Sequence, residues 1–191
     1  MKFELKPKYR HLVQKRYLCG PTCIQMVILR RNLGWIDQEK IAEELDARIM
    51  PAVKNSFATK LKTTKNESSV GLWLRELKGK KILIFFKKYK LPLKTKVFYV
   101  NKVKNAKSFI EENLIKNNDI MVNYWLKPFY KDRDNGHFSL ISAINNSKVT
   151  LCDPSRDSKA FWEADIDILV ESMSKQFDGS ERGFVIFSKT Q

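Results

Sequence analysis

The sequence predicts an α+β fold in which a helical N-terminal part packs against an antiparallel sheet. Strong helix signals come early in the chain, whereas most short apolar runs typical of strands come later. Two of the later runs, residues 138–144 and 148–152, flank the turn residues Asn145-Asn146-Ser147 and predict a hairpin. The length of 191 residues favours one domain over residues 1–191.

The best defined element is a buried helix that begins near Cys19. Gly20 and Pro21 mark a sharp turn into it, and proline fits the first turn because its missing N–H has no helical partner there. The helix is expected to end near Asn32-Leu33-Gly34, where asparagine and glycine are stop signals. Asp37 then caps a short amphipathic helix over residues 38–45.

The other elements follow from periodicity and turn residues. Residues 49–67 are expected to form a loop. Helices are expected at residues 70–77, 105–117 and 163–174, and strands at 81–86, 97–100, 120–126 and 183–187.

Composition indicates a soluble globular protein, with 43% hydrophobic and 30% charged residues. No apolar run reaches the roughly 18–20 residues of a membrane span, and the N-terminus lacks a signal-peptide core, which favours the cytoplasm. The net charge of +15 admits two interpretations. It favours an acidic partner, such as nucleic acid or an acidic protein, or it is a solvated lysine-rich surface, because the lysines are spread along the chain. Residues 87–96 are the best local candidate for an anion-binding patch.

Three cysteines are too few for a disulfide framework in a chain of this size, and with two histidines they lack a convincing zinc set, so no metal or cofactor is expected. Cys19 lies at the start of a helix, where unpaired N–H groups and the helix dipole favour the thiolate, the nucleophilic form. The alternative is that Cys19 is a small core residue. Cys23 is expected in the core, and Cys152 is expected to point away from any site.

His137 is the better candidate for a base that could serve Cys19. It opens the first strand of the predicted hairpin, and Asp153 follows the second strand, so both lie at the same end of the hairpin. A carboxylate beside a histidine fixes the tautomer and stabilises the imidazolium, which in turn stabilises a thiolate. His11 lies in the basic N-terminal segment and is expected to be a surface residue.

With these residues in view, the chain resembles the C39-like branch of the papain-like cysteine peptidases. The resemblance rests on Gln14 ahead of Cys19-Gly20-Pro21-Thr22-Cys23, on Gly136-His137-Phe138, and on residues 149–155, which include Asp153-Pro154. It covers most of residues 10–188, and the match is to a superfamily. It implies a papain-like fold, with the nucleophile at a helix start.

The resemblance also implies roles. Cys19 would be the nucleophile, His137 the general base and acid, and Asp153 the residue that orients His137. Gln14 and the Cys19 N–H would form the oxyanion hole, although Gln14 lies one residue closer to the cysteine than the family pattern places it.

The expected activity is that of a cysteine peptidase or isopeptidase acting on a peptide or protein substrate through a thioester. Two alternatives stay open: an acyltransferase or transglutaminase-like enzyme with the same triad, and a catalytically silent basic module that binds nucleic acid or an acidic protein. Plausible walls of a substrate site are Trp73, Trp125, Phe129 and Trp162, and residues 127–135 could shape access to it.

Overall fold

The computed structural model describes residues 2–177 and 179–190 and confirms the α+β prediction. In this part of the chain, seven strands form one antiparallel sheet in the order β4-β9-β5-β6-β7-β8, with β1 paired to β6. The strands are β1 (Lys2–Glu4), β4 (Leu93–Tyr99), β5 (Asp119–Trp125), β6 (Gly136–Asn145), β7 (Lys148–Cys152), β8 (Phe161–Asp165) and β9 (Gly183–Lys189).

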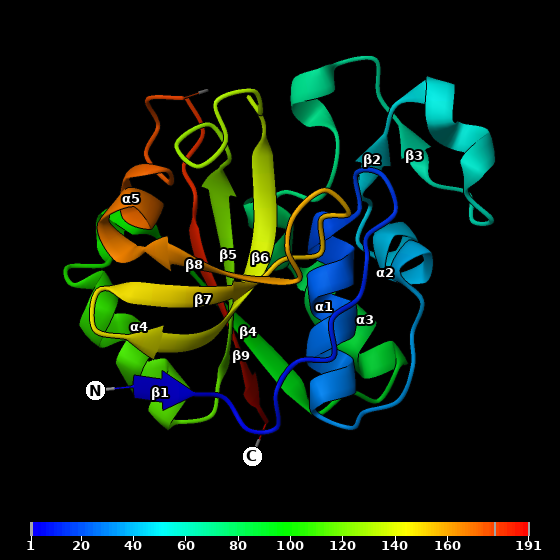
Figure 1. The fold of residues 1–191 in the computed structure, drawn as a ribbon. Helices are drawn as coiled ribbons and strands as arrows, with labels where there is room; N and C mark the ends of the chain where they lie inside the picture. The colour runs from blue at the N-terminus through cyan, green and yellow to red at the C-terminus, as the bar shows by residue number, and fades with distance from the viewer. Residues whose placement is uncertain (1, 178, 191) are drawn as a thin grey trace.

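The helices lie on two sides of this sheet. Figure 1 shows α1, α2 and α3 together on one side of the molecule, with α4 and α5 beside the sheet on the other. Helix α1 packs against β6, and α4 packs against β5. The α-helices are α1 (Cys19–Arg30), α2 (Gln38–Glu44), α3 (Lys80–Lys88), α4 (Ala106–Ile115) and α5 (Ile166–Glu171). The short 3-10 helices are η1 (Pro51–Ser56), η2 (Glu67–Ser69), η3 (Leu74–Leu77) and η4 (Val100–Lys102). Strand β2 (Arg48–Ile49) pairs with β3 (Lys62–Thr63) in a small parallel sheet.

The predicted start signals of α1 and α2 are confirmed. Helix α1 begins at Cys19, with Pro21 buried in its first turn. After it ends, Asn32 and Gly34 adopt positive φ angles of 55° and 96°, which asparagine and glycine tolerate best. The Asp37 carboxylate accepts the Glu39 N–H at 2.9 Å and so caps α2.

A buried ion cluster fixes the far end of α1 to the sheet. Asp119, the first residue of β5, is fully buried and accepts hydrogen bonds from the guanidinium groups of Arg30 and Arg31. The Tyr9 hydroxyl donates to the same carboxylate at 2.8 Å. The N-terminal segment, α1 and β5 therefore meet at one carboxylate.

The predicted hairpin is confirmed as β6 and β7. Its register pairs Leu140 with Cys152 and Asn145 with Lys148, and Asn146 takes a positive φ of 55° in the turn.

At the other side of the sheet, Gly183 of β9 lies so close to β4 that an added Cβ would be 2.1 Å from the Phe98 carbonyl oxygen. A larger residue could not occupy this position without moving the two strands apart.

The strand predicted at residues 81–86 is wrong, because this segment lies in helix α3. Ile82, Phe85 and Phe86 are buried, whereas Leu83 and Ile84 are exposed. This pattern is that of a helix with one buried face, and a short apolar run alone does not distinguish a helix from a strand.

Two helix predictions are wrong in extent. Within residues 70–77, only η3 (Leu74–Leu77) is helical, because Gly71 takes a φ of 83° and forms an antiparallel bridge with Arg48. Within residues 163–174, the first residues belong to β8, which pairs with β7 through Thr150 and Glu163, and α5 begins only at Ile166. Cross-strand pairing overrides the local helical pattern there. The predicted loop at residues 49–67 holds β3, η1 and the start of η2.

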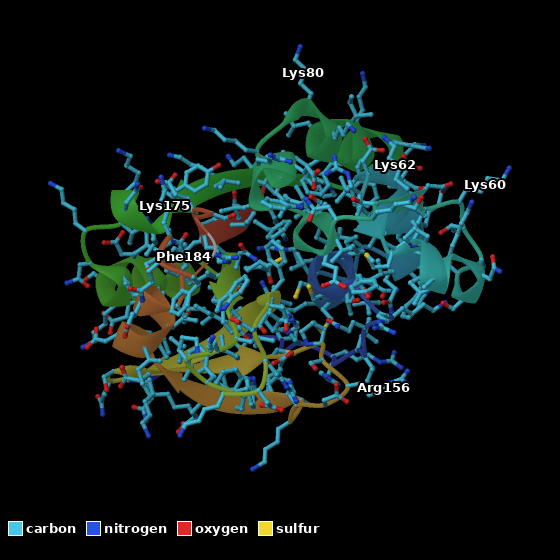
Figure 2. All side chains as sticks on the ribbon, turned by 90° about the horizontal axis from the view of Figure 1, so that it is seen from above. Lys60, Lys62, Lys80, Arg156, Lys175 and Phe184 are labelled. Carbon is cyan, nitrogen blue, oxygen red and sulfur yellow. The ribbon has the colours of Figure 1, made fainter. Side chains whose placement is uncertain are left out.

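A continuous core lies between the helices and the sheet, with Phe184 among its fully buried side chains. Figure 2 shows Lys60, Lys80 and Arg156 at separate places around the rim of the molecule. Among the described residues, no helix is both long enough and apolar enough to cross a membrane.

Candidate active site

Cys19 lies at the N-terminus of α1, where three segments converge. An added Cβ on the next residue, Gly20, would lie 3.2 Å from Leu72 and 3.3 Å from Phe138. Glycine therefore lets the first turn of α1 approach both β6 and the segment before η3. The Cys19 side chain is half-buried, so its sulfur is held by the fold yet open to a cavity that it lines.

The structure brings His137 and Asp153 together as the hairpin predicts. His137 is the second residue of β6, and Asp153 directly follows β7. His137 Nε2 lies 2.7 Å from Asp153 Oδ1, and both side chains are buried. The Tyr124 ring meets the imidazole edge to face, with centroids 5.8 Å apart, which fixes the plane of the imidazole.

Groups other than His137 also bind the Asp153 carboxylate. Its Oδ1 also accepts the Ser155 N–H at 2.8 Å, and its Oδ2 accepts the Trp162 indole N–H at 3.0 Å. Burial alone would raise the pKa of Asp153, but the hydrogen bond and charge of His137, with these N–H donors, lower it. Asp153 is thus a fixed carboxylate at neutral pH.

The charge of His137 follows from the same contacts. Burial alone would lower its pKa, but hydrogen bonds to Asp153 and Cys19 raise the pKa to about 10. His137 is therefore an imidazolium at neutral pH. Because Nε2 faces Asp153, Nδ1 is the ring nitrogen that remains for Cys19.

The other two thiols have a different environment. Cys23 is buried with its sulfur 3.5 Å from the Phe138 carbonyl oxygen, and the Cys152 sulfur lies 3.7 Å from the sulfur of Met26. Burial raises the pKa of Cys23 well above its usual range and that of Cys152 to about 12. Both are protonated core residues at neutral pH, in agreement with the sequence prediction.

Gln14 lines the same cavity as Cys19 despite its short spacing. The spacing is taken up by a tight turn in which the Leu18 N–H donates to the Lys15 carbonyl at 2.9 Å, with Tyr17 at a positive φ of 69°. The Gln14 N–H donates to the Pro154 carbonyl at 2.8 Å, which joins this segment to the residue after Asp153. The Gln14 Oε1 atom is buried and has no hydrogen-bond partner among the described residues, so Nε2 is the amide atom left to face the cavity.

The cavity has a volume of about 1020 Å³ and lies between the helical part and the sheet. His137 lines it with Cys19, and Asn135 in the preceding loop contributes, as expected for residues 127–135. Trp73 and Trp125 are wall residues as predicted. Phe129 and Trp162 are not among the lining residues, and Trp162 instead binds Asp153. Within the described part of the chain, no cluster of three or more His, Cys, Asp or Glu side chains could hold a metal ion.

Sequence reasoning did not predict the contacts that three residues make next to the site. His11 is only half-buried, and its Nε2 lies 2.8 Å from the Asp153 carbonyl oxygen. Trp162 binds the Asp153 carboxylate, and Gln38 binds the main chain beside Gln14. These contacts join residues far apart in the chain, and no local pattern signals them.

Comparison with solved structures identifies the fold. A structure described as a C39-like peptidase from Bacillus anthracis superposes with a TM-score of 0.62 at 13% identity, covering 100% of this chain and 99% of that one. The peptidase domain of Streptococcus ComA, a bi-functional ABC transporter involved in a quorum-sensing pathway, gives a TM-score of 0.54 at 15% identity, covering 96% and 99%. No protein-family model and no curated protein sequence matches the chain.

The chain therefore has the papain-like fold of the C39-like peptidases. As in the sequence prediction, helices make up the N-terminal part, Cys19 begins α1, and an antiparallel sheet carries His137.

Proposed function

We propose that the chain is a cysteine peptidase or isopeptidase in which Cys19, His137 and Asp153 form the catalytic triad. One observation carries the proposal: the buried imidazole of His137 is hydrogen-bonded to Asp153 and lines the same large cavity as Cys19 at the start of α1. A nucleophile that shares a cavity with a base, and a carboxylate that orients the base, make the arrangement that acyl transfer requires.

The reaction would begin with attack of the Cys19 sulfur on the carbonyl carbon of the scissile amide. The C–N bond then breaks, and the leaving nitrogen takes the proton held by His137, whose raised pKa keeps it protonated for this step. A thioester to Cys19 remains. A water molecule gives a proton to His137 and attacks the thioester, which releases the acid and returns Cys19 to its thiol or thiolate form.

The Cys19 N–H and the Gln14 side chain would stabilise the oxyanion of each tetrahedral intermediate. The Cys19 N–H is at the first position of α1, where backbone donors have no helical partner. Donors fixed in advance at such a position are typically worth about 10²–10³ in rate each. Trp73 and Trp125 would contact the substrate on the cavity walls.

Incubation with a mixture of peptides of varied sequence tests the proposal. We expect mass spectrometry to show new peptide termini with the wild type and none with Cys19→Ala, because the thioester cannot form without the sulfur. An added amine separates hydrolysis from transfer: free acids indicate a peptidase, and amides of the added amine indicate the transferase alternative. Peptides left intact by stoichiometric wild-type protein, or cut equally by Cys19→Ala, would reject the proposal.

A further inference from the structure

The Gln38 side chain binds the main chain on both sides of Gln14. Its Nε2 donates to the Val13 carbonyl at 3.2 Å, and its Oε1 accepts the Lys15 N–H at 2.7 Å. Both amide atoms are therefore used by the two peptide groups that flank Gln14. Gln38 is 8% exposed, so water does not compete freely for these bonds.

Gln38 is itself firmly placed. It is the first residue of α2, directly after the Asp37 cap. Thr22 of α1 comes three residues after the nucleophile, and its hydroxyl lies 2.9 Å from Gln38 Oε1. One buried amide thus links the helix that carries Cys19 to the segment that carries Gln14.

The next residue, Glu39, fastens the same segment from the side of α2. Its buried carboxylate pairs with the Lys15 ammonium group. It also accepts the N–H groups of Ala58 at 2.7 Å and Thr59 at 3.0 Å. The start of α2 is therefore also held by the main chain at Ala58 and Thr59, so Gln38 cannot shift easily with the segment that it binds.

The opposite side of the segment is tied to the triad. The Gln14 N–H bonds the Pro154 carbonyl, and His11 bonds the Asp153 carbonyl. Gln14 is fixed on this side by a single main-chain bond, whereas Gln38 fixes both of its neighbours. Without Gln38, the peptide groups before and after Gln14 would lose their partners, and the orientation of the Gln14 side chain would be free to vary.

We propose that Gln38 is a positioning residue of the oxyanion hole, which holds the Gln14 amide in place by binding the main chain at Val13 and Lys15. This proposal rests on the proposed function. It follows from the geometric demand of the oxyanion hole, since a donor is effective only when it is already about 2.7–3.1 Å from where the oxyanion will form. A donor on a loosened segment meets that demand for only part of the time.

Two reactions of Cys19 separate positioning from general structural support. Acylation by p-nitrophenyl acetate passes through a tetrahedral oxyanion and releases p-nitrophenolate in a single-turnover burst. Alkylation by iodoacetamide displaces iodide at a saturated carbon and forms no oxyanion. We expect Gln38→Met, which keeps the side-chain length and removes both hydrogen bonds, to lower the acylation rate about 10-fold or more. The alkylation rate should stay within about twofold of the wild type, since no oxyanion donor acts on it.

A double-mutant cycle shows whether Gln38 acts through Gln14. Gln14→Ala alone should lower the acylation rate, and adding Gln38→Met should then have little further effect. Gln25→Met is the matched control, because Gln25 is a buried glutamine of α1 whose Nε2 has no partner among the described residues, and it should leave both rates unchanged. If Gln38→Met does not give a cooperative unfolding transition, Gln38→Glu, which keeps the acceptor for Lys15 and removes the donor to Val13, takes its place.

Three outcomes would overturn the proposal. Acylation and alkylation could fall together in the Gln38 variant, Gln38→Met could have its full effect in the Gln14→Ala background, or Gln14→Ala could leave acylation unchanged. Each of these leaves a rapid acylation burst in the wild type, so the peptidase proposal survives. A wild-type burst no larger than that of Cys19→Ala would instead reject the peptidase proposal, and the role of Gln38 with it.

Discussion

Replacing Asp119 with alanine is expected to lower the free energy of unfolding by about 3–5 kcal/mol. Asp119 is fully buried and binds the side chains of Arg30, Arg31 and Tyr9. Removal of the carboxylate would leave two nearly buried guanidinium groups without their counter-charge, because the Arg30 and Arg31 side chains are only 1% and 5% exposed. Leaving a buried charge unpaired lowers the free energy of unfolding by more than the intact ion pair contributes to it.

Urea denaturation followed by circular dichroism measures this effect. Glu163→Ala is the control, because Glu163 pairs with Lys148 at 3.9 Å on an exposed surface and should contribute less than about 1 kcal/mol. Tyr9→Phe removes one hydrogen bond to the carboxylate and should cost about 1.5–3 kcal/mol, which keeps the test open if Asp119→Ala does not fold. A loss below about 1 kcal/mol for Asp119→Ala would contradict the account of this cluster.

Raising the pH from about 6.5 toward about 10 is expected to destabilise the protein through His137, by on the order of 5 kcal/mol at most. The pKa of His137 is raised to about 10 in the folded protein, because its interactions with the acceptors Asp153 and Cys19 outweigh burial, whereas an unfolded histidine titrates near 6.5. The folded state therefore binds the proton more tightly. The stabilisation by this proton is complete below about pH 6.5 and is lost as the pH rises through the folded pKa.

Unfolding free energies measured between pH 6 and pH 10 test this expectation. In a Cys19→Ala background, the difference between the proteins with and without His137→Ala isolates the His137 contribution, since no Cys19 thiol titrates with His137 and the other groups titrate in both proteins. His11→Ala in the same background is the matched control, because it removes a histidine and leaves the His137–Asp153 pair intact. Parallel curves with and without His137→Ala in that background would show that the proton on His137 does not stabilise the fold.

The parts of the site that the sequence predicted depend on short-range rules. The hairpin placed His137 and Asp153 at one end of two adjacent strands, because the ends of antiparallel neighbours meet. The turn at Gly20 and Pro21 placed Cys19 at a helix start. Strand pairing and helix capping are local enough to be visible in residue patterns.

The parts that failed depend on competition between local and distant contacts. The apolar run of α3 fits a strand or a helix equally well, and only packing of Phe85 and Phe86 against the core decides for the helix. At Gly71, a bridge to Arg48 replaces the expected helix. The contacts of Gln38 with Val13 and Lys15, and of His11 with Asp153, link distant segments, which single-sequence periodicity does not show.

The pH dependence of Cys19 alkylation tests the central claim most directly. Iodoacetamide reacts with the thiolate, and peptide mapping assigns the label to Cys19, Cys23 or Cys152. We expect Cys19 to react rapidly already near pH 6 in the wild type and much more slowly in His137→Ala, because the imidazolium that stabilises the thiolate is then lost. Cys23 and Cys152 should remain unlabelled in the folded protein, since burial raises the pKa of both thiols. A Cys19 rate that rises only near about pH 8.5, as for a free thiol, and is unchanged by His137→Ala would contradict the assembled catalytic site.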